Sequence, residues 1–214
     1  MWGFNYMENI TYVYLIRHAE QLKEDGIKNI NEDTQISNEK IPLSVKGEKQ
    51  AENVSNIKEL NNIYTLWSSN YVRAISTAKY IALNNKIDIN IDEKLGERKL
   101  GNLEKLRILG RNKKYSYTIE QLLDENLKNT GGESRKEVTK RMEQAFNKIL
   151  SDNIGKRVAI ISHGAAIKFL LMKWCKLNKC AEIEFRNKVI ILNTPGILKL
   201  IFENKELIDI LQVI

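Results

Sequence analysis

The sequence has very little proline, and Pro42 and Pro195 are its only two. No low-complexity tract or Ser/Gly-rich linker divides the chain, so we expect a single domain over residues 1–214. Residues 1–10 read as a short extension before the first strand. A length of 214 residues with 43% hydrophobic content is enough to bury a sizeable core.

Cysteine is equally rare. Cys175 and Cys180 are too few for a disulfide framework, and no other Cys or His lies close enough in sequence to complete a metal cage. We therefore expect free thiols in a reducing cytoplasm and no bound metal. The first residues lack the pattern of a secretory signal, and apolar stretches such as 158–161 are far too short to span a membrane. No membrane partner is expected.

The sequence also lacks a block of charge of one sign. Its net charge of +7 fits either an anion-attracting surface or lysine spread over solvated faces. Basic and acidic residues alternate along the chain, and no basic stripe is interleaved with aromatic residues, as a nucleic-acid groove requires. The pattern favours dispersed charge and no nucleic-acid partner, and it is compatible with a small anionic substrate.

Short apolar, β-branched runs are typical of buried parallel strands, and helical patterns separate most of them. This alternation predicts an α/β fold with three layers, in which helices flank a mostly parallel central sheet. Turn signals at Pro195-Gly196 and Glu203-Asn204 indicate that the sheet is mixed at its edge. The predicted strands are 12–16, 64–67, 87–91, 157–161, 189–193, 197–202 and 208–213.

Four helices are predicted from capping residues and apolar periodicity. Ser44 can cap a helix whose apolar positions extend to Leu60, and a second helix covers 74–83. Ser134 and Glu137 have the spacing of a capping box and precede a helix with one apolar face. A fourth helix, 165–174, begins directly after His163.

Histidine is the residue whose scarcity is most informative. Of the two in the chain, His18 follows the first predicted strand and His163 follows the strand at 157–161. The carboxyl ends of parallel strands form the ligand crevice of an open α/β sheet, so both imidazoles are expected at one pocket.

The neighbours of these histidines suit a phosphate ligand. Arg17 supplies a guanidinium fork beside a neutral imidazole that can attack phosphorus. Gly164 permits close backbone approach where a strand turns into a helix, a place that favours an anion. Arg73 lies within one turn of a predicted helix start and can reach the same crevice. The alternatives are a capped strand end for His18 and a surface arginine for Arg73.

Six ordered motifs resemble those of the histidine phosphatase superfamily, the phosphoglycerate mutase-like family, in its phosphatase branch. The resemblance runs over nearly the whole chain. The motifs are Arg17-His18-Ala19-Glu20; Pro42-Leu43-Ser44 with Gly47, Gln50 and Ala51; Ser68-Ser69 with Arg73-Ala74 and Thr77-Ala78; Leu95-Gly96-Glu97-Arg98 with Gly101; Gly131-Gly132-Glu133-Ser134 with Arg141; and Ser162-His163-Gly164.

The resemblance implies a metal-independent phosphatase with no cofactor that hydrolyses a small-molecule phosphate monoester. His18 would be the nucleophile that forms a phosphohistidine, and Arg17, Arg73 and His163 would hold the non-bridging oxygens. Glu97 would donate a proton to the leaving alcohol and then accept one from the attacking water.

Further substrate contacts are expected from Gln21, Gly164 and Ala165. Gln21 stands where the superfamily often has Ser or Thr, and Ala19 replaces the signature glycine, which requires a negative φ. Glu24 replaces a common Asn, and an acid at that place would favour a substrate with one phosphate and a neutral or cationic remainder.

Without the resemblance, Glu97 would be taken for a solvated acid in a charged run. Glu93 and Glu104 are its substitutes if the motif is shifted. Glu133 is a lesser site candidate beside the capping box at Ser134.

Two other functions stay open. A cofactor-dependent phosphoglycerate mutase would carry a Trp-Asn and a Phe-x-Gly-Trp stretch and longer shielding insertions, and their absence favours hydrolysis. A non-catalytic phospholigand-binding module would not need both histidines and Glu97. The substrate cannot be derived, because its determinants would lie in the 21–41 loop and the 101–130 insertion, where Tyr115, Tyr117 and Arg111 can line the entrance or coat the surface. The oligomeric state is equally open, because an exposed terminal strand can pair or be covered.

Overall fold

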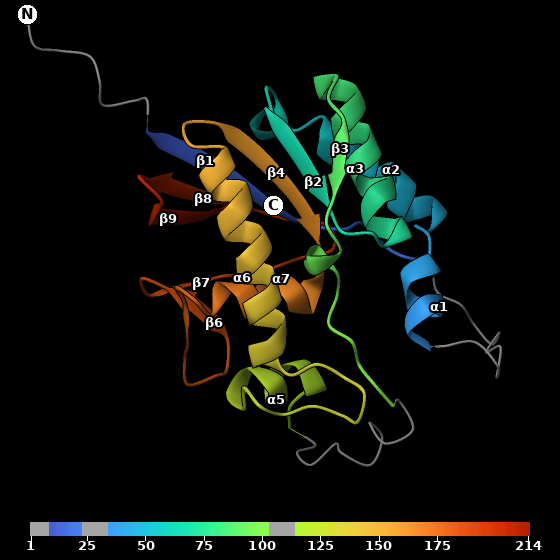
Figure 1. Ribbon diagram of the computed structural model, residues 1–214, viewed down its shortest axis with the longest axis vertical. Coiled ribbons are helices and arrows are strands. Elements are labelled where there is room, and N and C mark those ends of the chain that lie inside the picture. The colour runs from blue at the N-terminus through green and yellow to red at the C-terminus, as the bar shows by residue number, and fades with distance from the viewer. Residues whose placement is uncertain (1–8, 23–33, 103–113) are drawn as a thin grey trace, which may run out of the picture.

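The computed structural model describes residues 9–22, 34–102 and 114–214. Its main sheet has six strands in the order β3-β2-β4-β1-β8-β9 (Figure 1). The first four of these pair in parallel, whereas β8 and β9 pair antiparallel, so the sheet is mixed at one edge as the sequence predicts. The strands are β1 (Ile10–Arg17), β2 (Thr65–Ser68), β3 (Ile89–Ile91), β4 (Arg157–Ser162), β8 (Gly196–Glu203) and β9 (Glu206–Gln212).

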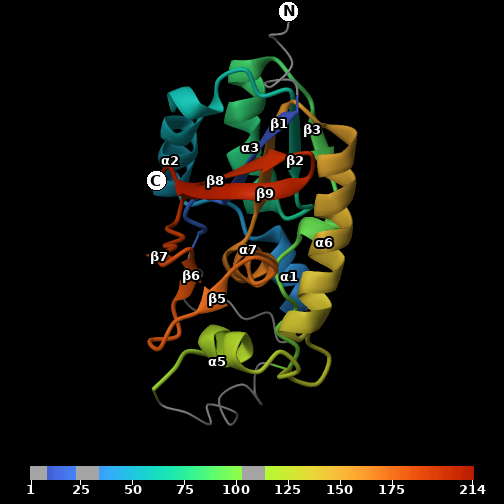
Figure 2. The ribbon, with the colours of Figure 1, turned by 90° about the vertical axis from the view of Figure 1, so that its left-hand side faces the viewer.

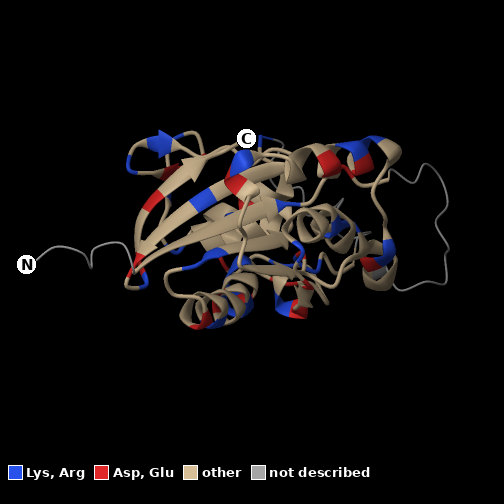
Figure 3. Ribbon diagram, turned by 90° about the horizontal axis from the view of Figure 1, so that it is seen from above, with Lys and Arg blue, Asp and Glu red and all other residues tan. Residues whose placement is uncertain are grey.

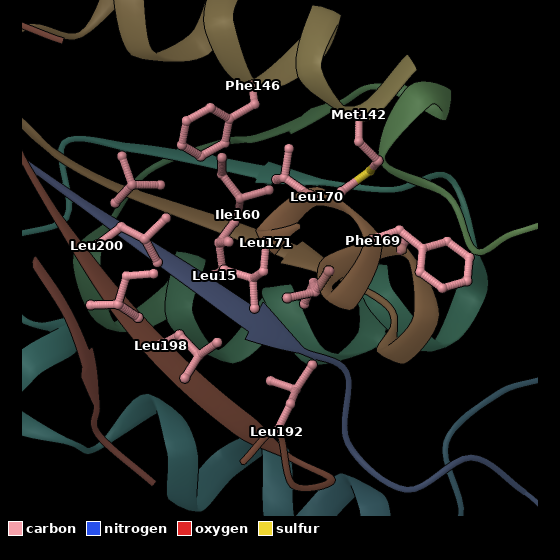
Figure 4. Close-up of a cluster of buried hydrophobic side chains, with 14 of the residues drawn as sticks. Leu15, Met142, Phe146, Ile160, Phe169, Leu170, Leu171, Leu192, Leu198 and Leu200 are labelled. Atoms are coloured by element: carbon pink, nitrogen blue, oxygen red, sulfur yellow. The ribbon is translucent and has the colours of Figure 1, made fainter. Parts of the chain in front are cut away.

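Helices cover both faces of this sheet, which confirms the predicted three-layer α/β fold (Figure 2). Helices α2 (Val45–Ser55) and α3 (Val72–Asn85) lie on one face, and α6 (Arg135–Asp152) and α7 (Gly164–Leu171) on the other. Each face has its own apolar cluster. Phe146 and Phe169 belong to the cluster under α6 and α7, shown in Figure 4, and Ile81 belongs to the one under α2 and α3.

The helix start at Ser134 shows the predicted capping box. Ser134 Oγ accepts from the backbone N–H of Glu137 at 3.2 Å, and the Glu137 carboxylate accepts from the Ser134 N–H at 2.9 Å. This reciprocal pair satisfies two donors that a helix N-terminus would otherwise leave unpaired.

The closest backbone approach near the site occurs at Gly47 in the first turn of α2. A Cβ atom there would lie 2.0 Å from the carbonyl oxygen of Glu20. Ser44 Oγ caps this helix on the Gly47 N–H, and the Ser44 N–H donates to the same Glu20 carbonyl at 2.9 Å. Glycine therefore lets the chain after His18 lie directly against the start of α2.

Several predicted boundaries are wrong. The helix after Ser44 ends at Ser55, and Leu60 belongs to a separate 3-10 helix, Lys58–Leu60. Helix α7 ends at Leu171 rather than at Trp174. The strand predicted over 189–193 is only β7 (Lys188–Val189), and further along the predicted range the carbonyl groups of Leu192 and Asn193 accept from Arg17.

Some elements were not predicted at all. They are α1 (Thr34–Lys40), α5 (Tyr117–Leu123), the 3-10 helix Glu93–Leu95, and the strands β5 (Lys176–Leu177) and β6 (Ile183–Phe185), which form a second sheet with β7. All are seven residues or shorter, so they contain too little periodicity to stand out in a sequence.

Basic and acidic residues are intermixed over the described ribbon, which agrees with the expected dispersed charge (Figure 3). Cys175 is buried and Cys180 is exposed, and both are free thiols as expected. Within the described ranges no helix combines the length and apolar character needed to cross a membrane.

Candidate active site

Three neighbouring strands end at the same edge of the sheet and deliver the central groups. His18 follows β1, His163 follows β4, and Ser69 follows β2. The ladder continues past the strand ends, because the His18 N–H donates to Ser162 O at 3.0 Å and the Ser69 N–H donates to Ile161 O at 3.1 Å. The backbone register therefore holds the two histidines side by side.

His18 is held as a neutral imidazole with its lone pair on Nε2. Its Nδ1 lies 2.7 Å from the carbonyl oxygen of Ala19, which can only accept, so Nδ1 carries the proton. Arg73 Nε, which can only donate, lies 3.2 Å from Nε2. Burial, and then the charge of Arg73, lower the pKa of His18 to about 3. The ring is thus unprotonated and its Nε2 faces a guanidinium.

His163 lies in contact with His18, with ring centroids 5.0 Å apart, and is fully buried. Its Nε2 is 2.7 Å from Ser69 Oγ, which itself accepts from the Tyr71 N–H at 3.4 Å. In the tautomer with the ring proton on Nδ1, the Ser69 hydroxyl donates to Nε2. That Nδ1 is buried and has no hydrogen-bond partner among the described residues. Burial is the largest cause that lowers the pKa of His163 well below its usual value.

Arg17 lies at the end of β1 against the start of α7. Its Nη1 donates to the carbonyl of Leu192 at 3.2 Å, whereas its buried Nε has no partner among the described residues. A Cβ atom at Gly164 would lie 3.0 Å from Arg17 Cζ, so glycine allows this close approach. Arg17 therefore offers an unused donor next to a helix N-terminus.

Arg73, in the first turn of α3, is not a surface arginine. It is 2% exposed. Besides the contact with His18, its Nη1 donates to Asn38 O at 2.5 Å and its guanidinium lies 4.8 Å from the centre of the Tyr71 ring. The Thr77 hydroxyl accepts from the Ala19 N–H and donates to Arg73 O. These two hydrogen bonds connect α3 to the turn after His18.

Glu97 binds the N-terminus of α7. Its carboxylate accepts from the N–H groups of Ala165 at 3.2 Å and Ala166 at 3.0 Å, and from its neighbour Arg98 at 2.8 Å. Glu97 is therefore not the solvated acid that its charged segment suggests. Its carboxylate occupies the N-terminus of α7, where the sequence predicts that an anion binds.

These groups surround a cavity of about 340 Å³ at the sheet edge. His163 packs against His18, and in this arrangement, with Glu97 bound to the start of α7, it is not among the residues that line the space. Gly164 and Ala165 are not among them either. Gln21 does line it, and its backbone forms an isolated bridge with Leu43. The lining residues are Arg17, His18, Glu20, Gln21, Asn38, Arg73, Glu97, Arg98, Leu100 and Thr194.

The remaining sequence candidates have other positions. Glu133 forms an ion pair with Arg141 at 2.8 Å and accepts from the Lys99 N–H, so it supports the segment after Glu97 rather than the cavity. Glu93 is exposed, and Ala19 is not among the residues with positive φ. Glu24 and Glu104 lie outside the described residues.

Sequence reasoning missed three lining or supporting groups: Ser69 as the partner of His163, Asn38 as the acceptor for Arg73, and Arg98. The position of Ser69 pointed to the site, because Ser69 follows β2 and β2 lies next to β4, the strand that precedes His163. In the described parts of the chain no group of three or more His, Cys, Asp or Glu is placed to hold a metal ion.

The family model of the histidine phosphatase superfamily (branch 1) matches residues 13–193. The chain belongs to this superfamily. The resemblance seen in the six motifs is thereby confirmed, and residues 13–193 include both histidines and Glu97.

Known proteins that are similar to this chain carry the names of mutases and of phosphatases. The "Probable phosphoglycerate mutase GpmB" of Salmonella choleraesuis is 31% identical over 177 residues, 81% of this chain and 79% of that protein. A mycobacterial glucosyl-3-phosphoglycerate phosphatase has a TM-score of 0.68 at 16% identity and covers 96% of this chain and 98% of its own. Phosphoglycerate mutase from Bacillus anthracis has a TM-score of 0.69 at 19% identity, with coverage of 94% and 92%. These structures share the phosphoglycerate mutase-like fold.

Proposed function

We propose that this chain is a phosphatase that hydrolyses a small-molecule phosphate monoester, without a metal, through a phosphohistidine on His18. The observation that carries the proposal is the state of His18, a neutral ring whose Nε2 lone pair lies at a cavity lined by Arg17 and Arg73. A nucleophile with two guanidinium groups beside it suits phosphoryl transfer, in which positioning and charge stabilisation dominate.

In the proposed first step, His18 Nε2 attacks phosphorus and the bond from phosphorus to the ester oxygen breaks. Arg17 Nε and His163 Nδ1, both without partners among the described residues, supply donors for the phosphoryl oxygens. The incoming group takes over the N–H groups of Ala165 and Ala166 that now bind Glu97. The released Glu97 takes up a proton from solvent and passes it to the leaving alkoxide, which departs as the neutral alcohol.

In the second step, water attacks phosphorus and Glu97, now a carboxylate, takes its proton. The N–P bond breaks, inorganic phosphate leaves, and His18 returns to its neutral form. Glu97 then releases the proton it took from water to solvent and binds the N-terminus of α7 again as a carboxylate, which restores the arrangement seen in the structure. The cycle needs no metal and leaves every residue unchanged.

The test is phosphate release from 4-nitrophenyl phosphate in excess EDTA, with wild type and His18→Ala compared. We expect wild-type activity to survive the chelator and to vanish in the variant, with thermal unfolding as the control for folding. A rapid quench with a ³²P-labelled ester should trap an acid-labile, alkali-stable label on the wild type only. Activity unchanged in His18→Ala, or lost in EDTA, would reject the proposal.

The second candidate is a phosphoglycerate mutase, and the similarity to the Salmonella protein of that name favours it. A mutase returns the phosphoryl group to a second hydroxyl instead of to water. Incubation of the wild type with 3-phosphoglycerate and 2,3-bisphosphoglycerate separates the two. Appearance of 2-phosphoglycerate with little free phosphate would support the mutase, and free phosphate as the main product would support the phosphatase.

The proposal places this reaction in the cytoplasm. Both cysteines of the chain are free thiols, and Cys180 is exposed. An exposed thiol of this kind fits a reducing compartment.

A further inference from the structure

The proposed reaction moves the Glu97 side chain, while the backbone that carries it is held by side chains from elsewhere in the fold. The carboxylate now binds the N–H groups of Ala165 and Ala166, and it leaves them to reach the ester oxygen. A general acid must lie within hydrogen-bond distance of the atom that it protonates. The place of the Glu97 backbone therefore decides whether one side chain can serve both positions.

Arg141, in α6, binds three backbone carbonyl groups of the segment 94–97. Its Nη1 donates to Lys94 O at 2.7 Å and to Gly96 O at 2.9 Å, and its Nη2 donates to Glu97 O at 3.0 Å. A carbonyl that bonds to a half-buried side chain instead of to water has a defined position. One side chain thus fixes the path of the chain up to Glu97.

Other side chains complete this support. The carbonyl between those of Lys94 and Gly96, Leu95 O, accepts from Ser162 Oγ at 2.7 Å. Ser162 ends β4, directly before His163. The Tyr71 hydroxyl also donates to Glu97 O, at 3.4 Å. Four successive carbonyl groups, 94 to 97, therefore bond to side chains of the sheet edge and its helices.

The Arg141 guanidinium is itself fixed by Glu133. Nε donates to Glu133 Oε1 at 2.8 Å and Nη2 to Oε2 at 2.9 Å, a bidentate ion pair. Together with the three carbonyl bonds, this pair uses all five N–H donors of the guanidinium. Burial raises the pKa of Glu133, but the hydrogen bonds and the charge of Arg141 outweigh it and hold that pKa below its usual value. Both groups are therefore charged near neutral pH.

Glu133 also binds the chain on the other side of Glu97. Its Oε2 accepts from the Lys99 N–H at 2.9 Å, and its own N–H donates to Lys99 O at 2.8 Å. A Cβ atom at Gly132 would lie 2.8 Å from Leu100 O, so glycine lets the two segments lie against one another. The Gly132-Glu133 motif and Arg141 thus attach the chain both before and after Glu97.

We propose that Arg141 and Glu133 are positioning residues for Glu97: they fix its backbone, so that rotation of the side chain alone carries the carboxylate from the start of α7 to the leaving oxygen. The inference rests on the proposed phosphatase function and adds the residues that make its general acid effective. Neither residue is among those that line the cavity. Their effect should therefore be confined to steps that need the acid.

The test compares two phosphate esters of similar size that differ in their need for an acid. 4-Nitrophenolate is stable enough to leave as an anion, whereas the alkoxide of benzyl phosphate has to be protonated as it leaves. The quantity to compare is kcat/KM, which covers the steps up to departure of the alcohol and excludes the later attack of water.

Arg141→Gln should act on one ester only. It should lower kcat/KM for benzyl phosphate by at least about tenfold, because a displacement of about 1 Å can cost about 10²-fold. For 4-nitrophenyl phosphate the loss should be less than about threefold, since little proton transfer is needed. Equal losses on both esters would show a general structural role and reject the inference.

Two further variants separate position from charge and from folding. Arg141→Lys keeps the positive charge but loses the planar fork, so its loss should be selective for benzyl phosphate and lie between those of wild type and Arg141→Gln. Glu133→Gln breaks the ion pair and should cause a smaller loss of the same selectivity. It keeps the test valid if Arg141→Gln does not fold. Wild-type behaviour of Arg141→Lys would assign the effect to charge and reject the inference.

Arg135→Gln is the matched control. Arg135 lies in the same helix and pairs with Glu125 at 3.6 Å. We expect this variant to keep the wild-type ratio between the two esters, with thermal unfolding measured for every variant. A selective loss as large as that of Arg141→Gln would indicate a general effect of α6 and reject the inference.

A double variant shows whether Arg141 acts through Glu97. In a Glu97→Gln background, which lacks the acid, Arg141→Gln should cause no further loss on benzyl phosphate. Losses that multiply would mean that Arg141 acts on another group, and they would reject the inference.

Failure of this inference differs from failure of the proposed function. Unselective losses in the Arg141 and Glu133 variants, with an active wild type, would reject the positioning role and leave the phosphatase intact. Absence of wild-type turnover on both esters would reject the proposed function itself.

Discussion

The cavity has two parts that arise from different kinds of structure. We call Arg17, His18 and Arg73 the histidine floor, and they lie at a strand end and in the first turn of α3. We call Arg98 with its partners Thr118 and Gln121 the Arg98 wall, and both partners lie on the seven-residue helix α5. The floor follows from sheet register, whereas the wall follows from side-chain packing between distant loops. Chemistry common to all substrates is expected on the floor and discrimination between substrates on the wall.

After loss of the nucleophile His18 itself, the largest expected effect on the floor comes from Arg73→Gln. Loss of the guanidinium beside His18 Nε2 should lower kcat/KM by about 10³-fold for every ester alike, the range seen when a transition-state donor is removed. Arg157→Gln is the matched control, because Arg157 also donates to backbone carbonyls but lies at the opposite end of β4. A loss of the same size in both variants would contradict the role of Arg73 beside His18.

The next effect should come from Glu97→Gln, which removes a negative charge at the start of α7. Turnover should fall by about 10²-fold, since no proton can be donated to the leaving group. Binding of inorganic phosphate, followed by calorimetry, should become tighter because the anion no longer competes with a carboxylate. Weaker phosphate binding would contradict the position that the structure assigns to Glu97.

A smaller effect is expected from Ser69→Ala, which removes the partner of His163 Nε2. We expect kcat/KM to fall by about tenfold, as for loss of a buried hydrogen bond that orients a functional group. The pH profile should also move, because the His163 ring then loses the hydroxyl that pairs with Nε2, and its Nδ1 has no partner among the described residues. Ser68→Ala is the control, since Ser68 is equally buried but its hydroxyl donates to Ser69 O. Equal effects of both variants would indicate a purely structural role.

The smallest effect concerns acid stability, in which the floor should again differ from the wall. The pKa of His18 is lowered to about 3, and that of His163 also lies well below its usual value. Below pH 6.5 the unfolded chain therefore binds protons that the folded chain does not, so stability is lost as the pH falls from 6.5 toward 3. Each histidine should contribute about 1 kcal/mol per pH unit.

Urea unfolding at pH 7, 6 and 5 tests this expectation. His18→Gln should reduce the loss of unfolding free energy by about 1 kcal/mol per pH unit, the contribution of one histidine. Arg98→Lys should leave it unchanged, because both side chains stay charged over this range. A wild-type unfolding free energy that does not fall between pH 6.5 and pH 5 would contradict the neutral, buried state of the two rings.

Much of the floor was predictable from local patterns. Short β-branched runs located β1, β2 and β4, and the residues directly after them are the ones that meet at the sheet edge. Parallel pairing brings strand ends together whatever the loops do, so a histidine next to a strand end carries positional information. The short elements, α1, α5 and the second sheet, carry no such period and were missed.

The role of an individual side chain was less predictable where its partners are distant in sequence. Glu97 lies in a charged run that reads as surface, yet it bonds to backbone groups 68 and 69 positions away. Arg98 reads the same way, and only its contacts with Gln121 and Thr118 show that it is buried.

The sequence by itself determined the succession of the main-sheet strands and the longer helices, the superfamily and the placement of both histidines at one edge, because these depend on local periodicity and on motifs with short spacing. Only the tertiary structure decided which nitrogen of the His18 imidazole carries its proton, where the Glu97 carboxylate lies, and that the Arg98 guanidinium bonds to Gln121 and Thr118. Those properties depend on hydrogen-bond partners from distant segments, and burial then sets the strength of each interaction.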